Sequence, residues 1–281
     1  MGEVIFDTVL DGVKLLPFLF LTYLAMEFLE HKTSDKTKRA VKRSGKAGPL
    51  IGAVLGAFPQ CGFSTAASNL YAGRVITLGT LIAIYLSTSD EMLPVFLSEQ
   101  VSIVLILELI AIKVVIGAVM GFLIDFVIRK SVKNEDMVSK IGHICDHDHC
   151  HCEKSIVKSA LRHTITIFAY IIIISFALNT VIHLVGEDAL ANLILNKPVI
   201  GPIICGIVGL IPNCAASVVL TQLYIGGVVS LGSMMAGLLA GSGVGLIVLF
   251  KENRDIKENF KILGILYLIG VVCGILMDFI I

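Results

Sequence analysis

Long apolar runs separated by short polar stretches fill this chain. The runs lie at about 5–29, 75–97, 101–128, 160–184, 228–250 and 262–281. A helix needs about 20 apolar residues to cross the roughly 30 Å hydrocarbon core of a bilayer, and each run approaches or exceeds that length. The pattern therefore predicts an all-α integral membrane protein.

Two further apolar segments are too short on either side of a proline to cross a membrane. They lie at about 49–73 and 202–226 and are interrupted by Pro59 and Pro212. The arm 49–58 would extend only about 15 Å as a helix, roughly half of the hydrocarbon core. These segments are predicted to form re-entrant helical hairpins with tips near the midplane. The runs that follow them are interrupted too, at 87–91 and at 241–245.

The hairpin motif occurs twice. Pro59, Cys61 and Ser64 recur 153 positions later as Pro212, Cys214 and Ser217, and the same offset holds without a gap through the rest of each half. Self-similarity at a fixed period indicates duplication. It divides the chain into a first membrane repeat (1–128), a linker (129–153) and a second repeat (154–281). Counting each hairpin arm as a helix gives ten helices, with three spanning helices and one hairpin per repeat.

Charge placement orients the repeats. Most of the 22 Lys and Arg residues fall in 31–48, 129–163 and 251–261. The positive-inside rule places these segments and the linker in the cytosol and both termini outside, in a cell (inner or plasma) membrane. An odd number of spans per half makes the two repeats inverted, so the hairpins enter from opposite sides and their tips meet.

Composition narrows the class. Hydrophobic residues make up 56% of the chain and charged residues only 16%, which excludes a soluble fold. The first run follows acidic residues, with no basic region before it, and is expected to be retained rather than cleaved. The lipid bilayer is therefore the expected environment, no nucleic-acid partner is expected, and a homodimer is left open.

Polar side chains cluster at the two predicted tips. They are Gln60, Cys61, Ser64, Asn213, Cys214 and Ser217. Paired interruptions at matching positions indicate a substrate site. The alternative is that each proline kinks a packed helix and the small residues allow close approach. Asn69 and Gln222, one to two turns further on, would line the path or hydrogen-bond a neighbouring helix.

Ionisable residues inside apolar runs are functional candidates. Asp90 and Glu91 offer hard oxygen ligands to a divalent cation, unless the span ends at Leu86 and they belong to an outer loop. Glu108 and Lys113 are candidates for ion coupling and, five residues apart, point to different helix faces.

The equivalent Asp125 and Asp278 lie near the ends of their repeats. That position is interfacial, and it favours a snorkelling or helix-capping role for both carboxylates.

The linker carries a dense tract of metal-binding side chains. They are His143, Cys145, Asp146, His147, Asp148, His149, Cys150, His151 and Cys152. Reduced thiols beside imidazoles and carboxylates suit a transition metal, although the fixed spacing of a structural zinc site is missing. The tract predicts a metal collector or sensor; the alternative is a linker that binds metal without consequence.

Several functions are disfavoured. No phosphate-binding G-x-x-x-x-G-K-[ST] loop occurs, so a proton or sodium gradient is the expected energy source. No H-E-x-x-H or G-x-S-x-G motif occurs, and no enzymatic activity, catalytic residue or required cofactor is expected.

The duplicated Pro-Gln/Asn-Cys hairpins, interrupted spans and His/Cys/Asp-rich linker resemble the family of ten-helix heavy-metal exporters. Some of its members are labelled arsenic efflux proteins and others manganese transporters. The resemblance extends over almost the whole chain and implies secondary export of a toxic or surplus metal.

The residues favour a divalent cation, manganese first, because it prefers oxygen ligands. Arsenite or organoarsenical efflux through Cys61 and Cys214 is one alternative. An anion carrier that uses hairpin helix N-termini and a non-transporting membrane metal sensor are the others.

Overall fold

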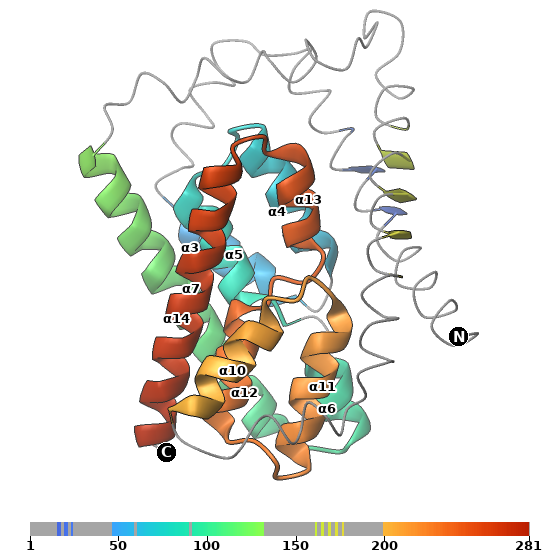
Figure 1. The fold of residues 1–281 in the computed structure, drawn as a ribbon, viewed down its shortest axis with the longest axis vertical. Helices are drawn as coiled ribbons and strands as arrows, with labels where there is room; N and C mark the ends of the chain where they lie inside the picture. Colours follow the sequence, from blue (N-terminus) through green and yellow to red (C-terminus); the bar gives the residue numbers. More distant parts are fainter. Residues whose placement is uncertain are drawn as a thin grey trace, which may run out of the picture.

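The computed structural model describes residues 47–58, 61–89, 92–131 and 199–280, with isolated positions between 16 and 24 and between 161 and 176. Every regular element in these ranges is a helix, in agreement with the predicted all-α class. The helices (Figure 1) are α3 (Gly48–Gly56), α4 (Cys61–Ala72), α5 (Leu78–Ser87), α6 (Met92–Ser98), α7 (Ile103–Ser131), α10 (Ile200–Gly209), α11 (Cys214–Ile225), α12 (Leu231–Ala240), α13 (Gly245–Glu252) and α14 (Ile256–Ile280).

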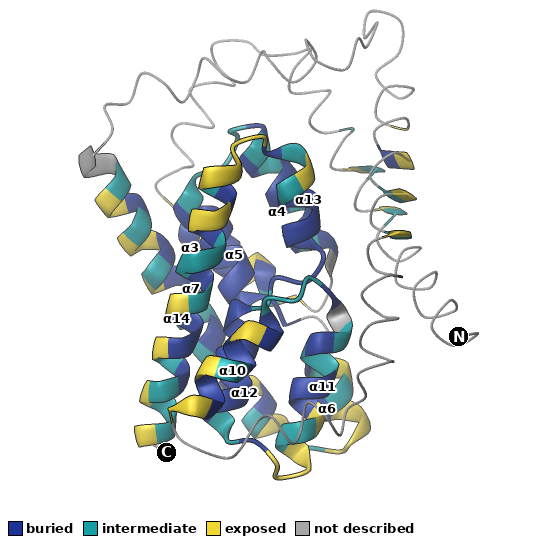
Figure 2. Ribbon diagram, in the orientation of Figure 1, coloured by how far each residue is buried: buried dark blue, intermediate teal, exposed yellow. Residues whose placement is uncertain are grey.

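Within this described part, four apolar segments are long enough to cross a membrane: Leu78–Ser98, Ile103–Ile128, Leu231–Glu252 and Ile256–Ile280. They correspond to four of the predicted spans, whereas the runs at about 5–29 and 160–184 lie outside the described residues apart from isolated positions. The first and third segments are mostly buried inside the protein (Figure 2). The long helices α7 and α14 instead expose large apolar side chains such as Val115 and Leu268, as lipid-facing helices do.

The predicted interruptions are present. The helix that begins at Leu78 ends at Ser87, and α6 follows from Met92. In the second half α12 ends at Ala240 and α13 begins at Gly245, and between them Gly243 adopts a left-handed φ of 53° that glycine tolerates without strain. The short segments around the prolines also form two helices each, α3 with α4 and α10 with α11.

Equivalent helices begin at equivalent positions. The starts of α4, α5, α6 and α7 are each repeated 153 positions later by α11, α12, α13 and α14. The alignment that the hairpin motif suggested therefore extends to the helix starts of both halves, including those of the interrupted spans.

The hydrogen bonds at the ends of the long helices repeat as well. Asp125 accepts bonds from the Thr77 hydroxyl at 2.7 Å and the Gly79 amide at 2.9 Å, at the start of α5. Asp278 accepts the matching bonds from Ser230 at 2.7 Å and from the Gly232 amide at 2.8 Å, at the start of α12. A carboxylate at a helix N-terminus satisfies amides that have no partner within the helix. The capping role predicted for the two aspartates is confirmed.

The interrupted helices α5 and α12 form the centre of the described structure. Long helix α7 packs on α5 and α3, and α14 packs in the same way on α12 and α10. At one end of the molecule (top of Figure 1) α4 packs along α13, and at the opposite end α11 packs on α6. The second arm of each hairpin, α4 or α11, thus lies beside the interrupted span of the other half, whereas the first arms, α3 and α10, pack on α5 and α12 of their own half.

The sequence prediction placed the start of the last helix too late. It begins at Ile256 rather than near residue 262, because Asp255 accepts a bond from the Glu258 amide at 3.1 Å and caps the first turn. An acidic residue followed three positions later by Glu is a helix-start signal. The helix therefore begins here although its first turn contains the charged residues Lys257 and Glu258.

Candidate transport site

The two helix breaks bring together polar groups from both halves. The first break follows α5 at Thr88 and Ser89, and the second separates α12 from α13 at Gly241 to Val244. Thr88, Ser89 and Ser242 are all buried. Helix breaks leave backbone groups without helical partners, and at membrane depth such groups persist only where protein or a watery path satisfies them.

Lys113 lies beside both breaks. Its side chain is fully buried, and its ammonium group donates to the carbonyl oxygen of Thr88 and, at 3.1 Å, to that of Leu238 in the last turn of α12. The side chain of one residue on α7 therefore contacts one carbonyl from each half. The sequence singled out this residue, but nothing in the sequence indicated which backbone groups it would contact.

A second buried contact joins three helices at Ser68. Its hydroxyl lies 2.6 Å from the Tyr85 hydroxyl of α5 and 2.7 Å from the Gly245 carbonyl at the start of α13. It also lies 2.8 Å from the Ser64 carbonyl, one turn earlier in α4. The Ser68 hydroxyl therefore holds α4, the second arm of the first hairpin, against the interrupted helices of both halves.

Two predicted site residues lie in this interior. Ser64 is fully buried, and a Cβ atom added at Gly245 would lie only 2.9 Å from the Ser64 Cβ. The start of α4 is therefore in direct contact with the start of α13. Asn69 is also buried, with 2% of its surface exposed.

The second hairpin presents its polar residues differently. Asn213 is buried and caps α11, because its side-chain oxygen accepts a bond from the Ala215 amide at 3.2 Å. Ser217 is half-buried, and Gln222 is exposed although the equivalent Asn69 is not. Asn213 thus caps a helix at the hairpin tip, in addition to any contact with a substrate.

Other predicted site residues lie outside the described residues. They are Gln60, Asp90, Glu91 and the linker tract His143, Cys145, Asp146, His147, Asp148, His149, Cys150, His151 and Cys152. Cys61 and Cys214 begin α4 and α11, but their side chains are likewise outside the described part. In the ranges that are described, no group of three or more His, Cys, Asp or Glu side chains could hold a metal ion.

The two coupling candidates on α7 face different environments. Glu108 is exposed among the apolar side chains of the outer face, whereas Lys113 is fully buried. Their five-residue spacing predicted this difference. Of the two, the structure brings only Lys113 to the helix breaks.

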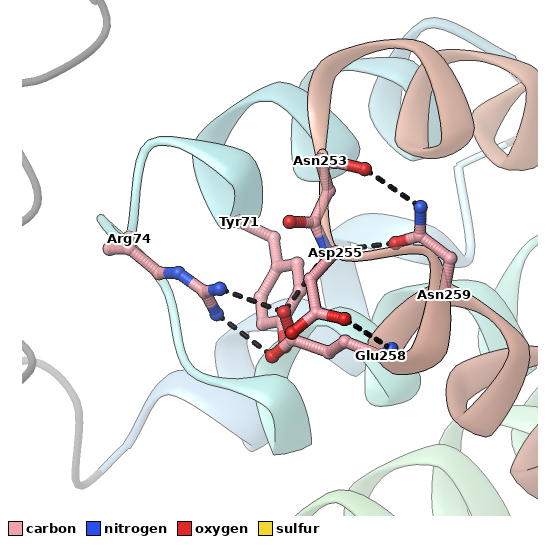
Figure 3. Close-up of polar contacts among 6 residues, drawn as sticks. All are labelled: Tyr71, Arg74, Asn253, Asp255, Glu258 and Asn259. Carbon is pink, nitrogen blue, oxygen red and sulfur yellow. Dashed lines mark hydrogen bonds and ion pairs between the residues drawn. The ribbon is translucent and has the colours of Figure 1, made fainter.

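A polar cluster closes the α4–α13 end of the molecule (Figure 3). Arg74 donates to both carboxylate oxygens of Glu258, at 2.9 and 2.7 Å, and the Tyr71 hydroxyl donates to the same carboxylate at 2.5 Å. Asn253 donates to it as well, at 3.1 Å. Hydrogen bonding to Glu258 raises the pKa of the Arg74 guanidinium, which stays charged. This clamp connects the end of the first hairpin to the last helix.

The backbone at the clamp explains why the charge pair is needed. Arg74 has a left-handed φ of 58°, and the equivalent position in the second half is Gly227 with a φ of 71°. The same turn occurs twice, but a residue with a Cβ adopts it at a cost. The bonds from Arg74 to Glu258 offset that cost in the first half.

Sequence reasoning missed Ser68, Tyr71 and Glu258, which join the halves, and it missed the contacts of Tyr85 with Ser68 and of Thr88 with Lys113. A single hydroxyl in an apolar run is equally consistent with helix packing, and no spacing rule links residues 68, 85 and 245. The available signal was weak: Ser68 and Tyr85 are polar groups in largely apolar segments, whereas Glu258 is one of many charged residues in 251–261.

Comparison with known families agrees with this architecture. Residues 2–189 match a family model described as "Putative, 10TM heavy-metal exporter". The chain belongs to this family. The match includes the first hairpin, the first interrupted span and α7, and it confirms the resemblance drawn from the hairpin motifs and the linker. No curated protein and no solved structure matches the chain.

Family membership and the apolar helices together make this a multi-pass membrane protein. The heavy-metal exporter family is a class of transporters rather than of enzymes, and its description names a metal as the transported species.

Proposed function

We propose that this protein is a secondary active transporter that exports a transition metal or metalloid, with a divalent cation such as manganese favoured. The observation that carries the proposal is the contact between the first hairpin arm and the interrupted helix of the other half, at Ser64, Ser68 and Gly245. Hairpins and broken helices that meet inside a membrane protein are typical of substrate sites in transporters.

The chemistry of the described groups favours an oxygen-seeking cation. Hydroxyls, amides and backbone carbonyls surround the breaks, and these are ligands that manganese accepts. Gln60, Asp90 and Glu91 adjoin the same segments in sequence and would complete the ligand set. The metal-binding tract of the linker would collect the ion on the cytosolic side.

Alternating access follows from two inverted repeats. One half would move against the other about the site, with the α4–α13 contact and the α11–α6 contact parting in turn. Described basic residues support the orientation: Arg74, Lys251, Arg254, Lys257 and Lys261 all belong to the α4–α13 end, which the positive-inside rule makes cytosolic. Either protons or sodium would drive export.

Arsenite or organoarsenical efflux is the second candidate, because Cys61 and Cys214 open equivalent helices, α4 and α11, and trivalent arsenic binds thiols. An anion carrier would use the same helix N-termini. A membrane metal sensor would need the linker but tolerate changes at the hairpins.

Metal uptake into inverted vesicles tests the proposal, with manganese, zinc, cobalt and arsenite measured in parallel. We expect manganese uptake that falls at least tenfold in Gln60→Ala and Asn213→Ala, a loss of about 1.4 kcal/mol in transition-state binding. Ser98→Ala is the control, since Ser98 is exposed and bonds only within its own helix.

The other outcomes assign the function elsewhere. Arsenite uptake that is lost only in Cys61→Ser and Cys214→Ser would indicate arsenite efflux through these two thiols. Uptake of none of the four would contradict a metal exporter and leave the anion carrier and the sensor.

A further inference from the structure

Two helices end where the Lys113 ammonium group lies. Thr88 directly follows the last residue of α5, and Leu238 belongs to the last turn of α12. The last carbonyls of a helix have no amide partner within the helix and carry the negative end of its dipole. The ammonium group donates to one such carbonyl from each helix.

Carbonyls at the ends of interrupted helices are the ligands that membrane transporters use for sodium. In this chain a lysine side chain reaches them instead, and it is fully withdrawn from solvent. A primary ammonium group resembles a small monovalent cation in charge and in its demand for several oxygen partners.

The duplication shows that this charge is not a packing requirement of the fold. The equivalent position on α14 is Leu266, which is also fully buried. An apolar side chain therefore fills the same place in the second half. One half has a lysine where the other packs a hydrocarbon side chain, and the lysine reaches across to a carbonyl of the second half.

We propose that Lys113 occupies a monovalent-cation site built from the C-terminal carbonyls of α5 and α12, as a cation that the protein carries permanently. The carrier then needs no bound sodium at this position. Lys113 would occupy this site whichever substrate the protein carries.

Removal of the side chain should open the site to an added cation. We expect Lys113→Ala to unfold at a lower temperature than the wild type and to be restabilised by sodium or ethylammonium, measured in detergent against choline at equal ionic strength. Sodium at ten times its dissociation constant would shift the folding equilibrium about elevenfold. For a chain of this size that raises the unfolding midpoint by roughly 3–6 °C.

Matched variants isolate the site. Lys113→Met fills the space without a charge, and we expect no response to sodium. Lys261→Ala removes an exposed lysine of α14, and its midpoint should stay that of the wild type with and without sodium. A Lys113→Ala protein that ignores sodium, potassium and ethylammonium would overturn the proposal, as would a wild type that sodium stabilises equally.

If Lys113→Ala does not fold in choline buffer, we expect it to fold when sodium or ethylammonium is present throughout purification. Failure to fold with either cation would overturn the proposal. The stability measurement needs no transported substrate. If no metal is transported and sodium still stabilises Lys113→Ala, the exporter function fails while the cation site stands.

Discussion

At the scale of single residues, the interior of this membrane protein depends on a few buried hydroxyls. Ser68 contacts α5, α13 and its own helix through one oxygen atom. Inside the hydrocarbon region water cannot replace a lost partner, so each of these groups depends on the others. A residue of this kind determines where a helix packs and has little effect on whether the segment forms a helix.

Ser68→Ala should destabilise the protein by about 1–3 kcal/mol, because it leaves the buried Tyr85 hydroxyl and the Gly245 carbonyl without this partner. Thermal unfolding in detergent measures the change. The exposed Ser98 makes a local bond only, and Ser98→Ala should leave the midpoint unchanged. Equal midpoints for both variants would show that the three-helix contact at Ser68 does not stabilise the fold.

At the scale of elements, glycines set how closely the central and outer helices approach. A Cβ atom at Gly79 would lie 2.1 Å from the Gly121 carbonyl oxygen, and one at Gly232 would lie 2.2 Å from that of Gly274. Both pairs join an interrupted helix to a long helix, at equivalent places in the two halves. The helices touch through their backbones, as small residues allow in membranes.

Gly79→Ala and Gly232→Ala should each destabilise the fold by roughly 1–3 kcal/mol, since the nearest obstructing atom at each is a backbone carbonyl oxygen that cannot move aside. Gly264 on α14 is the control, because a Cβ atom there meets nothing within 4 Å. Gly264→Ala should be neutral or stabilising by up to about 1 kcal/mol. Unfolding midpoints that fall equally in all three variants would contradict the close-approach explanation.

At the scale of the whole molecule, the two halves are held together at one end by charge. The Arg74–Glu258 pair connects the first hairpin to the last helix, with side chains 22% and 25% exposed. The corresponding positions at the opposite end are Gly227 and Leu105, which cannot form such a pair. The two ends of a transporter with this asymmetry would not open with equal ease.

A double-mutant cycle with Arg74→Ala and Glu258→Gln should give a coupling of roughly 1 kcal/mol, above that of an exposed pair because the contact is bidentate and partly buried. Thermal unfolding of the single and double variants provides the cycle. The pair Lys261 with Glu258 serves as the control cycle. Additive effects of the Arg74 and Glu258 substitutions would show that this ion pair does not hold the two halves together.

The linker acts at the same scale. Deletion of residues 143–152 should weaken the apparent affinity for metal in inverted vesicles while leaving measurable transport, because the hairpins and helix breaks are untouched. An equally long Gly/Ser replacement controls for chain length. Complete loss of transport in both variants would contradict an accessory role for the tract.

The class, the breaks and the internal duplication of this protein could be predicted from the sequence, because they depend on local features: apolar run length, proline position and a fixed period of self-similarity. The helix starts at equivalent positions and the capping aspartates follow from the same local chemistry. The contacts between distant groups could not be predicted, since no spacing rule relates Lys113 to the Leu238 carbonyl or Ser68 to Gly245. In the membrane interior every polar group must find a partner, and that partner is chosen by how the helices cross.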